Sequence, residues 1–519
     1  MSRGKEEANS NCPENGAEAK CSTESQKLNK YAFACVLAAS IVSSIFGYAV
    51  GVMAGALLYI KEDLKISDLQ VELLVGVLNA CAIPGCMVAG RTSDFIGRRY
   101  TLILCSIIYL LGSILLGFSP SYAVLLIGRC ITGIGVGFSL NVVSVYCAEI
   151  SPPSHRGFLA SLPDLSIVMG ISLGYVSNYF FGKLSLKLGW RIMVGLPSIP
   201  SLVLAVSMLK LVESPRWLVM QGRIGESKQV LLLISNTKEE AEKRLQEIKI
   251  SAGIVNDDDG QDLVQVVTYQ TRRGEGALKE LFCKPSPSVR RILIISMALH
   301  VFQQAAGIEG VLSYSPRIFQ RTGITNKSML HLATLGMGIA QVIFTYSATF
   351  LMDRVGRKAL LLISSGGSAM ALLGLGICLT IVESTEKKVI WAPYFATVAT
   401  YLFVAFFQLG MGPATWVYSC EIFPLRLRAQ GQAIGVVVNR TINVVLVTAF
   451  ISIYEKITMG GTYFMLGGLT VLAWLFCYFF LRETKGRSLE DIEIIFGQDY
   501  YKSPNKSKPA DHQFNANNA

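Results

Sequence analysis

Long apolar runs alternate with short polar segments along most of the chain. Twelve of these runs contain about 18 or more residues with few charges, which is enough for a helix to cross the roughly 30 Å hydrocarbon core of a bilayer. A helix bonds its own backbone polar groups, so it tolerates that environment. The pattern therefore predicts an all-α membrane protein with twelve transmembrane helices. The predicted spans are 32–58, 71–90, 100–118, 122–148, 157–181, 190–211, 291–316, 329–351, 359–381, 391–417, 431–454 and 462–481.

The composition supports a membrane protein and argues against a soluble one. Of the 519 residues, 51% are hydrophobic and 16% are charged, whereas about 25% charged residues are usual in soluble domains. The net charge of +11 does not indicate a nucleic-acid partner, because the basic residues are spread over the segments between the apolar runs. We find no CxxC pattern or Cys/His cluster and therefore predict no metal site. The sequence shows neither a nucleophile–base pair nor a phosphate-binding loop, so we do not expect an enzyme.

The placement of Lys and Arg predicts the orientation. With the N-terminus in the cytoplasm, 34 of the 47 basic residues lie in cytoplasmic segments or at the span ends that border them, 10 lie in outward loops and three lie deeper within spans. Positive residues favour the cytoplasmic side, so both termini are expected there, and no cleavable signal peptide is expected. The expected organisation is a disordered cytoplasmic tail (1–30), an N-terminal six-helix bundle (31–211), a cytoplasmic helical linker (212–290), a C-terminal six-helix bundle (291–481) and a cytoplasmic tail (482–519).

Three motifs occur twice at nearly the same spacing, which indicates an internal duplication. The pairs are G-R-T-S-D-F-I-G-R-R (90–99) with D-R-V-G-R-K (353–358), Y-C-A-E-I-S-P around Glu149 with Y-S-C-E-I-F-P around Glu421, and E-S-P-R-W-L (213–218) with E-T-K-G-R-S-L (483–489). Each copy follows the second, fourth or sixth span of its half. The duplication predicts two pseudo-symmetric six-helix bundles related by an axis along the membrane normal, an architecture typical of alternating access.

Acidic and basic residues gather at the cytoplasmic ends of these spans. They either anchor the helix ends at the interface or form ion pairs that break and re-form between two conformations. Their repetition at matching positions favours ion pairs, which we predict to close the cytoplasmic side of the outward-facing conformation. The predicted cytoplasmic gate consists of Asp94, Arg98, Arg99, Glu149, Arg156, Glu213, Arg216, Asp353, Arg357, Glu421, Arg428 and Glu483.

These motifs, together with Q-Q-x-x-G-I in the seventh span, resemble those of the sugar porter family of the major facilitator superfamily over about residues 31–497. F-G-Y-x-x-G-V-M-x-G-A, L-G-Y-V-S-N-Y-F, Y-S-P-R-I-F and L-R-A-Q-G resemble plant polyol and monosaccharide transporters more narrowly. The resemblance implies transport of linear polyols, inositol or simple sugars, usually with protons as the coupling ion and no other cofactor. It also implies the plasma membrane. The expected partners are a small polyhydroxylated substrate and the lipid bilayer, with no nucleic acid, and we expect a functional monomer.

Ionisable and amide side chains inside a span are costly and usually face a cavity or a partner. Q-Q-A-A-G-I-E in the seventh span surrounds Gly307 and precedes Pro316, so a helix break is expected there. Amides donate and accept hydrogen bonds, as substrate hydroxyls do; interhelical hydrogen bonds alone are the alternative. Glu309 either accepts hydroxyls or pairs with the Arg440 charge. By resemblance, the predicted substrate-binding residues are Gln303, Gln304, Glu309, Tyr314, Trp416, Asn439, Arg440 and Asp164.

The first span lacks the carboxylate that the resemblance leads us to expect. Proton-coupled members carry Asp after F-G-Y, opposite an Arg of the fourth span, whereas here Ala49 follows F-G-Y and Arg129 is retained. Ala cannot titrate, so that mechanism cannot operate at this position. Asp164 is the best substitute acceptor, followed by Glu309. Three possibilities stay open: an unusual proton symport through Asp164 and Arg129, uniport, and a sugar or polyol sensor that does not transport.

Overall fold

The structure is a computed structural model that describes residues 29–152, 156–251, 286–312, 319, 327–384, 391–424 and 427–485. Helices make up nearly all of the regular structure. The helices of the first half are α1 (Lys30–Leu64), α2 (Asp68–Ile96), α3 (Arg98–Gly117), α4 (Tyr122–Ile150), α5 (Arg156–Phe181), α6 (Leu186–Gly195) and α7 (Ser198–Met208). Three short helices follow, α8 (Pro215–Met220), α9 (Ile224–Ile234) and α10 (Lys238–Ser251). The second half contains α12 (Pro287–Ala305), α14 (Lys327–Val355), α15 (Arg357–Ser384), α16 (Trp391–Leu409), α17 (Met411–Ile422), α18 (Arg428–Ile457) and α19 (Met459–Phe480).

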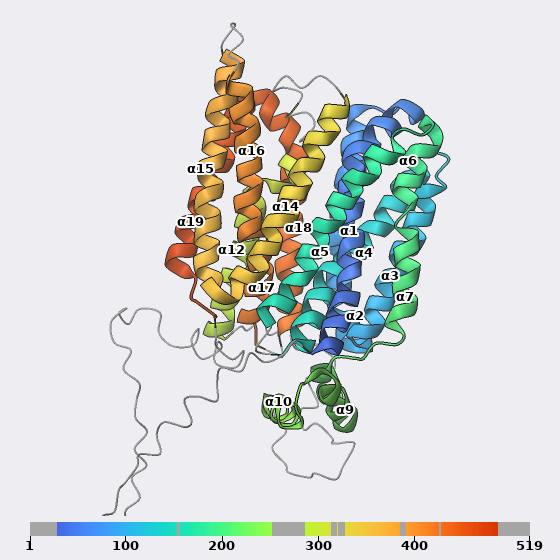
Figure 1. Ribbon diagram of the computed structural model, residues 1–519, viewed down its shortest axis with the longest axis vertical. Helices are drawn as coiled ribbons and strands as arrows, with labels where there is room; N and C mark the ends of the chain where they lie inside the picture. Colours follow the sequence, from blue (N-terminus) through green and yellow to red (C-terminus); the bar gives the residue numbers. More distant parts are fainter. Residues whose placement is uncertain are drawn as a thin grey trace, which may run out of the picture.

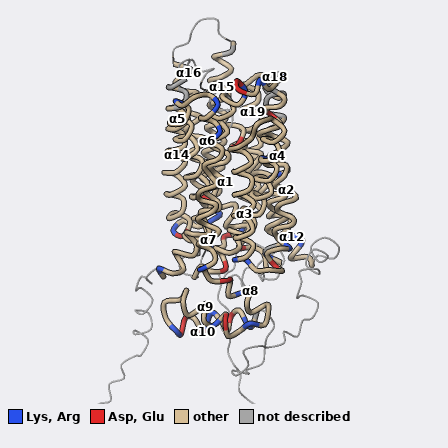
Figure 2. The backbone as a smooth tube through the Cα atoms, turned by 90° about the vertical axis from the view of Figure 1, so that its right-hand side faces the viewer, with Lys and Arg blue, Asp and Glu red and all other residues tan. Residues whose placement is uncertain are grey.

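Within the described residues, 12 helical segments are long and apolar enough to cross a membrane, which confirms the number of spans predicted from the sequence. Charged residues gather near the two ends of the long helices and in the short helices below them (Figure 2). The sixth span differs from the continuous helix that we predicted, because it consists of α6 and α7 with Pro197 between them. The tenth span is likewise divided at Gly410 into α16 and α17.

The helices form two groups that lie side by side (Figure 1). One group contains α1 to α7 and the other contains α12 and α14 to α19. They meet along two helix pairs, α2 with α18 and α5 with α14. The second span of each half therefore packs against the fifth span of the other, as a two-fold relation between the halves requires.

The linker helices α8, α9 and α10 lie beyond one end of the long helices, which we call the linker end (Figures 1 and 2). They are attached to the first half: the Asn29 side chain donates to the Ser235 carbonyl at 3.0 Å, and Arg244 donates to the carbonyls of Ile150 and Ser151, where α4 ends. Burial, followed by the nearby charge of Arg216, lowers the pKa of Arg244 to about 10. The described linker helices are therefore bound to the first half.

Helix boundaries follow from local sequence signals. Ser67 and Gln70 form a capping box at the start of α2, in which each side chain accepts the other's backbone N–H. At the linker end, α2 stops at Gly97 with φ 95° and α14 stops at Gly356 with φ 100°. Residues with side chains rarely adopt such angles, so both glycines turn the chain directly into the next helix.

Glycines allow α1 and α5 to pack at very short range. Gly47, Gly51 and Gly55 recur every four residues on one face of α1, and Gly170 and Gly174 do so on α5. A Cβ atom at Gly51 would lie 2.3 Å from the Ile171 carbonyl oxygen. This is the small-residue packing by which helices associate in membranes, where backbone contact replaces the hydrophobic effect.

Replacing Gly51 with Ala is expected to destabilise the protein, because the added methyl group would force α1 and α5 apart. We expect a loss of about 1–3 kcal/mol, typical of overpacked sites, measured as a lower Tm of the purified protein in detergent. Gly468→Ala is the matched control, since nothing lies within 4 Å of its added methyl group. Equal Tm values for the two variants would contradict the close packing of α1 and α5.

Candidate functional site

The break expected in the seventh span is present at Gly307. The helix α12 ends at Ala305, Gly307 has φ 79°, and helical conformation resumes at Ile308. A Cβ atom at Gly307 would lie 2.7 Å from the Leu466 side chain, so only glycine fits without displacement. The break sets Gln303 and Gln304 on one side of the turn and Glu309 on the other.

Gln303 connects this break to the break in the tenth span. Its Nε2 donates to the carbonyls of Met411 at 2.9 Å and Gly412 at 3.0 Å, directly after Gly410. Its Oε1 accepts from Nδ2 of Asn439 at 2.8 Å. The two interrupted helices are therefore held together by one buried amide.

Asn439 on α18 stands at the centre of a polar network, which we call the central network. Its Oδ1 accepts from Gln304 at 3.0 Å and from Nε and Nη2 of Arg440. Asn443, one turn along α18, donates to Oε1 of Gln304 at 3.0 Å. The three predicted amides, those of Gln303, Gln304 and Asn439, are thus connected with the predicted Arg440 in one network, and all four residues are buried.

Arg440 links the two halves. Its Nη1 lies 3.0 Å from Glu309 Oε1, with side-chain exposures of 3% and 17%, and 3.2 Å from Oδ1 of Asn79 on α2. Glu309 therefore occupies the position suggested from the sequence, as the partner of Arg440. A charge at this depth needs such a partner.

Trp416 joins the network through His300. The two rings lie 5.0 Å apart between centroids with an interplanar angle of 63°. The His300 ring also contacts the Ser419 hydroxyl at 3.2 Å and the Asn439 amide at 3.5 Å. Tyr314 lies outside the described residues.

Sequence reasoning missed three members of the central network. His300 lies one turn before Gln303 on the same helix, and this spacing could have identified it. Asn443 follows Asn439 by one turn, so the four-residue spacing on a polar stripe could have identified it. Asn79 has no such local signal, because only the packing of α2 against α18 brings it to Arg440.

Among the described residues, no hydrogen bond joins Asp164 to the central network. It follows Pro163 within α5, and its Oδ2 atom is buried without a hydrogen-bond partner among the described residues. Arg129 is also separate: it donates to the carbonyls of Ala49 at 3.2 Å and Leu74 at 3.3 Å. Within the described part of the chain neither Asp164 nor Glu309 forms an ion pair with Arg129, so the structure does not supply the substitute partner that we sought.

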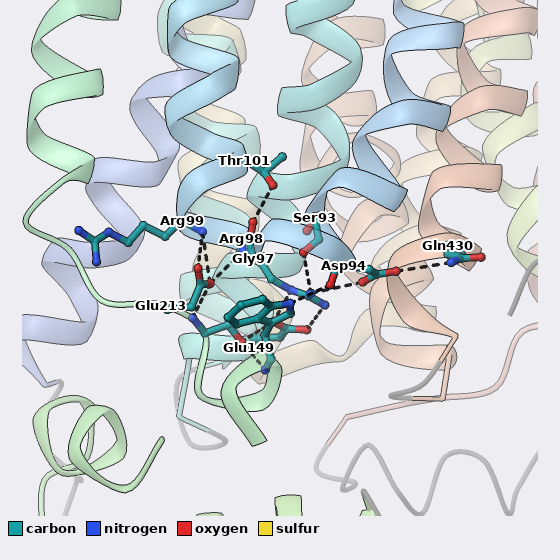
Figure 3. A network of polar contacts seen from close by, with 11 residues as sticks. Ser93, Asp94, Gly97, Arg98, Arg99, Thr101, Glu149, Glu213 and Gln430 are labelled. Atoms are coloured by element: carbon teal, nitrogen blue, oxygen red, sulfur yellow. Dashed lines mark hydrogen bonds and ion pairs between the residues drawn. The ribbon is translucent and has the colours of Figure 1, made fainter. Parts of the chain in front are cut away.

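At the linker end, Arg98 organises a cluster of the first half (Figure 3). Its Nε and Nη2 atoms donate to the two carboxylate oxygens of Glu149 at 3.0 and 3.2 Å, and its Nη1 lies 3.3 Å from Asp94 Oδ1. Ser214 also donates to Glu149. Arg98 and Glu149 are 4% and 3% exposed, so this is a buried, bidentate ion pair.

Glu213 caps the start of α3 in the same cluster. Its oxygens accept from the backbone N–H groups of Arg98 at 2.9 Å and Arg99 at 3.1 Å (Figure 3), which satisfies two of the free donors at a helix start. Burial raises the pKa of the Glu213 carboxyl above its usual value, while the N–H groups of Ser214 and Arg99 oppose that change.

The second half repeats the arrangement. Arg357 donates to Glu421 at 2.9 Å and lies 3.4 Å from Asp353. Glu483 accepts from the backbone N–H groups of Arg357 at 2.8 Å and Lys358 at 3.0 Å. Thr484 donates to Glu421, as Ser214 does to Glu149. The sequence repeats therefore correspond to equivalent geometry.

Contacts of Asp94 and Asp353 at the linker end cross between the halves. Gln430 near the start of α18 approaches Asp94 Oδ2 at 3.5 Å (Figure 3), and the backbone N–H of Phe158 near the start of α5 donates to Asp353 Oδ2 at 3.0 Å. In each case the aspartate pairs with an arginine of its own half through one oxygen and reaches the other half through the second.

Two of the remaining gate residues donate to backbone carbonyls. Arg99 donates to the carbonyls of Met208 and Leu209, and Arg216 forms no ion pair among the described residues, its Nη1 having no hydrogen-bond partner there. Arg428 donates to the Phe423 carbonyl at 3.3 Å. The side chain of Arg156 lies outside the described residues. Charge alone could not show that helix-terminal carbonyls accept hydrogen bonds from Arg99 and Arg428.

Residues 35–496 match the family described as "Sugar (and other) transporter". The chain belongs to this family, and its resemblance to the sugar porters is confirmed. It is 54% identical over 474 residues to "Probable polyol transporter 6" of Arabidopsis thaliana, covering 91% of this chain and 95% of the relative. It is 50% identical over 483 residues to "Polyol transporter 5" of the same plant, covering 93% and 89%.

Solved structures of the xylose transporter XylE have the same fold. A structure described as the proton:xylose symporter XylE bound to 6-bromo-6-deoxy-D-glucose gives a TM-score of 0.75 at 26% identity, covering 90% of this chain and 99% of that chain. The inward open conformation of XylE from E. coli gives 0.66, covering 90% and 100%. The predicted fold class, an integral membrane protein of two six-helix bundles, is confirmed. Because the relatives are transporters, the expectation that the chain is not an enzyme is also confirmed.

Replacing Glu149 with Ala should strongly destabilise the protein, because it leaves Arg98 buried without its bidentate partner. Removing one member of a buried ion pair costs about 3–5 kcal/mol. The control is Glu226→Ala, whose pair with Arg223 is about half exposed and should contribute about 0–1 kcal/mol. Thermal unfolding in detergent measures both. If the two variants lost similar stability, the Arg98–Glu149 pair would not be a structural element of the first half.

Proposed function

We propose that the protein transports small uncharged polyhydroxylated compounds, namely linear polyols, inositol or monosaccharides, by alternating access. The observation that supports this most directly is the central network of Gln303, Gln304, Asn439 and Arg440 beside a broken helix, where the two halves meet. Amides both donate and accept hydrogen bonds, so they can exchange their mutual bonds for bonds to hydroxyl groups. The polyol-transporter relatives favour the same substrate class.

Trp416 and Glu309 give this site its selectivity in our proposal. The indole of Trp416 offers one N–H donor and an apolar face for C–H groups. Glu309 keeps part of its side chain exposed while pairing with Arg440, so its free lone pairs can accept substrate hydroxyls. Because this pair is internally neutral, the site suits an uncharged compound better than an ion.

In our proposal the linker end is closed in the conformation that contains this site. We propose that the Asp94–Gln430 and Asp353–Phe158 contacts hold that end shut, as the predicted gate requires. The linker end faces the cytoplasm in our proposal, with both termini on that side and the protein in the plasma membrane as a functional monomer. The higher TM-score to sugar-bound XylE than to its inward open form favours a closed linker end.

Uniport is the mode of transport that the geometry favours. Ala49 faces Arg129 through its backbone carbonyl alone, so no carboxylate there can change protonation between two conformations. Proton symport through Asp164 is the second candidate, and one observation favours it. The Oδ2 atom of Asp164 is buried and unpartnered among the described residues, and such an atom could receive a proton. The proton would then be the coupling ion, with no other cofactor.

Uptake into proteoliposomes distinguishes these modes. We expect labelled sorbitol, mannitol, xylitol, inositol or glucose to equilibrate across the membrane at a rate independent of an imposed inward proton gradient. Accumulation above equilibrium that an uncoupler abolishes would instead establish symport, and its loss in Asp164→Asn would assign the acceptor. Binding of a substrate without flux would overturn transport and identify a sensor.

Replacing Gln304 with Leu should raise KM for the transported compound about tenfold, because the variant removes an amide that binds Asn439 and Asn443 and each lost hydrogen bond contributes about 0.5–1.5 kcal/mol. The control is Gln341→Leu on α14, another buried amide, whose side chain has no hydrogen-bond partner among the described residues. It should leave KM unchanged. Concentration-dependent uptake, normalised to protein in the liposomes, measures both. A similar KM for the two variants would exclude Gln304 from the substrate site.

A further inference from the structure

A small cavity lies beside the unpaired Arg129, between α1, α3, α4 and the α6–α7 break. Its wall includes Ala49 and Arg129 together with three hydroxyl-bearing side chains, those of Tyr109, Ser113 and Thr132. The rest of the wall is apolar. The cavity is separate from the central network, none of whose residues lines it.

Arg129 lies at this cavity with most of its hydrogen-bonding capacity unused. The residue is 2% exposed. A guanidinium has five N–H groups, and Arg129 uses two of them, toward Leu74 and Ala49. Three N–H groups therefore have no hydrogen-bond partner among the described residues. No carboxylate in that part of the chain forms an ion pair with Arg129, which contrasts with Arg98, Arg357 and Arg440.

The neighbouring hydroxyls are neutral and differ in availability. Thr132 donates to the Gly128 carbonyl at 3.1 Å, and Tyr109 shares a hydrogen bond with Ser139. The hydroxyl of Ser113, which is 2% exposed, has no hydrogen-bond partner within the described residues. The cavity wall therefore offers one cation and one free O–H donor, with no negative charge.

A buried cation without a counter-charge is costly, and the cavity is large enough to hold about one water molecule or an ion of similar size. A water molecule would bind the free N–H groups but would leave the charge uncompensated. We propose that Arg129 binds a monatomic halide, chloride in the cell, in the cavity beside Ala49, with Ser113 as a further donor.

A bound halide would explain how Arg129 is retained opposite Ala49. It supplies the negative charge that a carboxylate at position 49 would supply, but it does not take up a proton at physiological pH. The site would therefore stabilise the first half without coupling it to a proton gradient. This inference concerns the structure of the first half and does not depend on which compound is transported.

Thermal unfolding of the purified protein tests the proposal without any transport measurement. At constant ionic strength, Tm should be a few degrees higher in sodium chloride or sodium bromide than in sodium gluconate, whose anion is too large for the cavity. The increase should follow the halide concentration, as binding to the folded state requires. Equal Tm values in the three salts would overturn the proposal and indicate that water suffices.

Two variants at position 49 locate the effect. Ala49→Asp places a carboxylate beside Arg129 and should be stable in gluconate with no further gain from chloride. Ala49→Asn fills the same space beside Arg129 without a charge. It should therefore lose the chloride effect and remain less stable than Ala49→Asp in every salt. A chloride effect that persists in both variants would place the halide elsewhere and refute the site. An anomalous scattering peak beside Arg129 in a bromide-soaked crystal would support the site directly, and a crystal with bound bromide elsewhere but none there would refute it.

Discussion

The cost of holding a charge away from water is the constraint on which this structure depends. The long helices contain few charges, and several of the buried ones meet an opposite charge at hydrogen-bonding distance. Arg98 meets Glu149 in a bidentate pair, and Arg357 meets Glu421. Because an unmatched member of such a pair is far more costly than the pair itself, each pair fixes the relative positions of the helices that carry it. Arg129 is an informative exception, since among the described residues its guanidinium group donates only to backbone carbonyls and borders a small cavity.

Because the sequence motifs are duplicated, both halves satisfy this constraint with the same arrangement of residues. In both halves a glycine with positive φ, Gly97 or Gly356, turns the chain from one span into the next. The space that a side chain would occupy is filled by a carboxylate, that of Glu213 or Glu483, which caps the next helix. The glycine and the glutamate are therefore interdependent, although more than a hundred residues separate them. This explains physically why both motifs occur in each half at matching positions.

The spans, the duplication and the acidic and basic clusters could be predicted because hydropathy and motif spacing are properties of the sequence itself. The break at Gly307 was also predictable, since glycine and proline act on their own backbone. The hydrogen-bond partner of each polar side chain could not be predicted in the same way. Arg99 and Arg428 bind carbonyls at helix ends, and nothing in their charge distinguishes them from Arg98. Asn79 reaches Arg440 only because α2 packs on α18. This packing depends on how the two halves are placed relative to each other, which the local sequence around Asn79 does not indicate.

The two aspartate contacts that cross between the halves at the linker end are weaker than the buried ion pairs within each half, and this difference suits alternating access. Buried ion pairs hold each bundle together, whereas Asp94 meets an amide at 3.5 Å and Asp353 meets a single backbone N–H of the other bundle. Rocking one bundle against the other would therefore break few strong interactions. Arg440 adds a connection, because it binds Asn79 of the first half and Asn439 of the second at once. In our proposal a substrate that takes hydrogen bonds from Asn439 must change the bonding of Arg440, so binding in the second half is transmitted to its contact with the first.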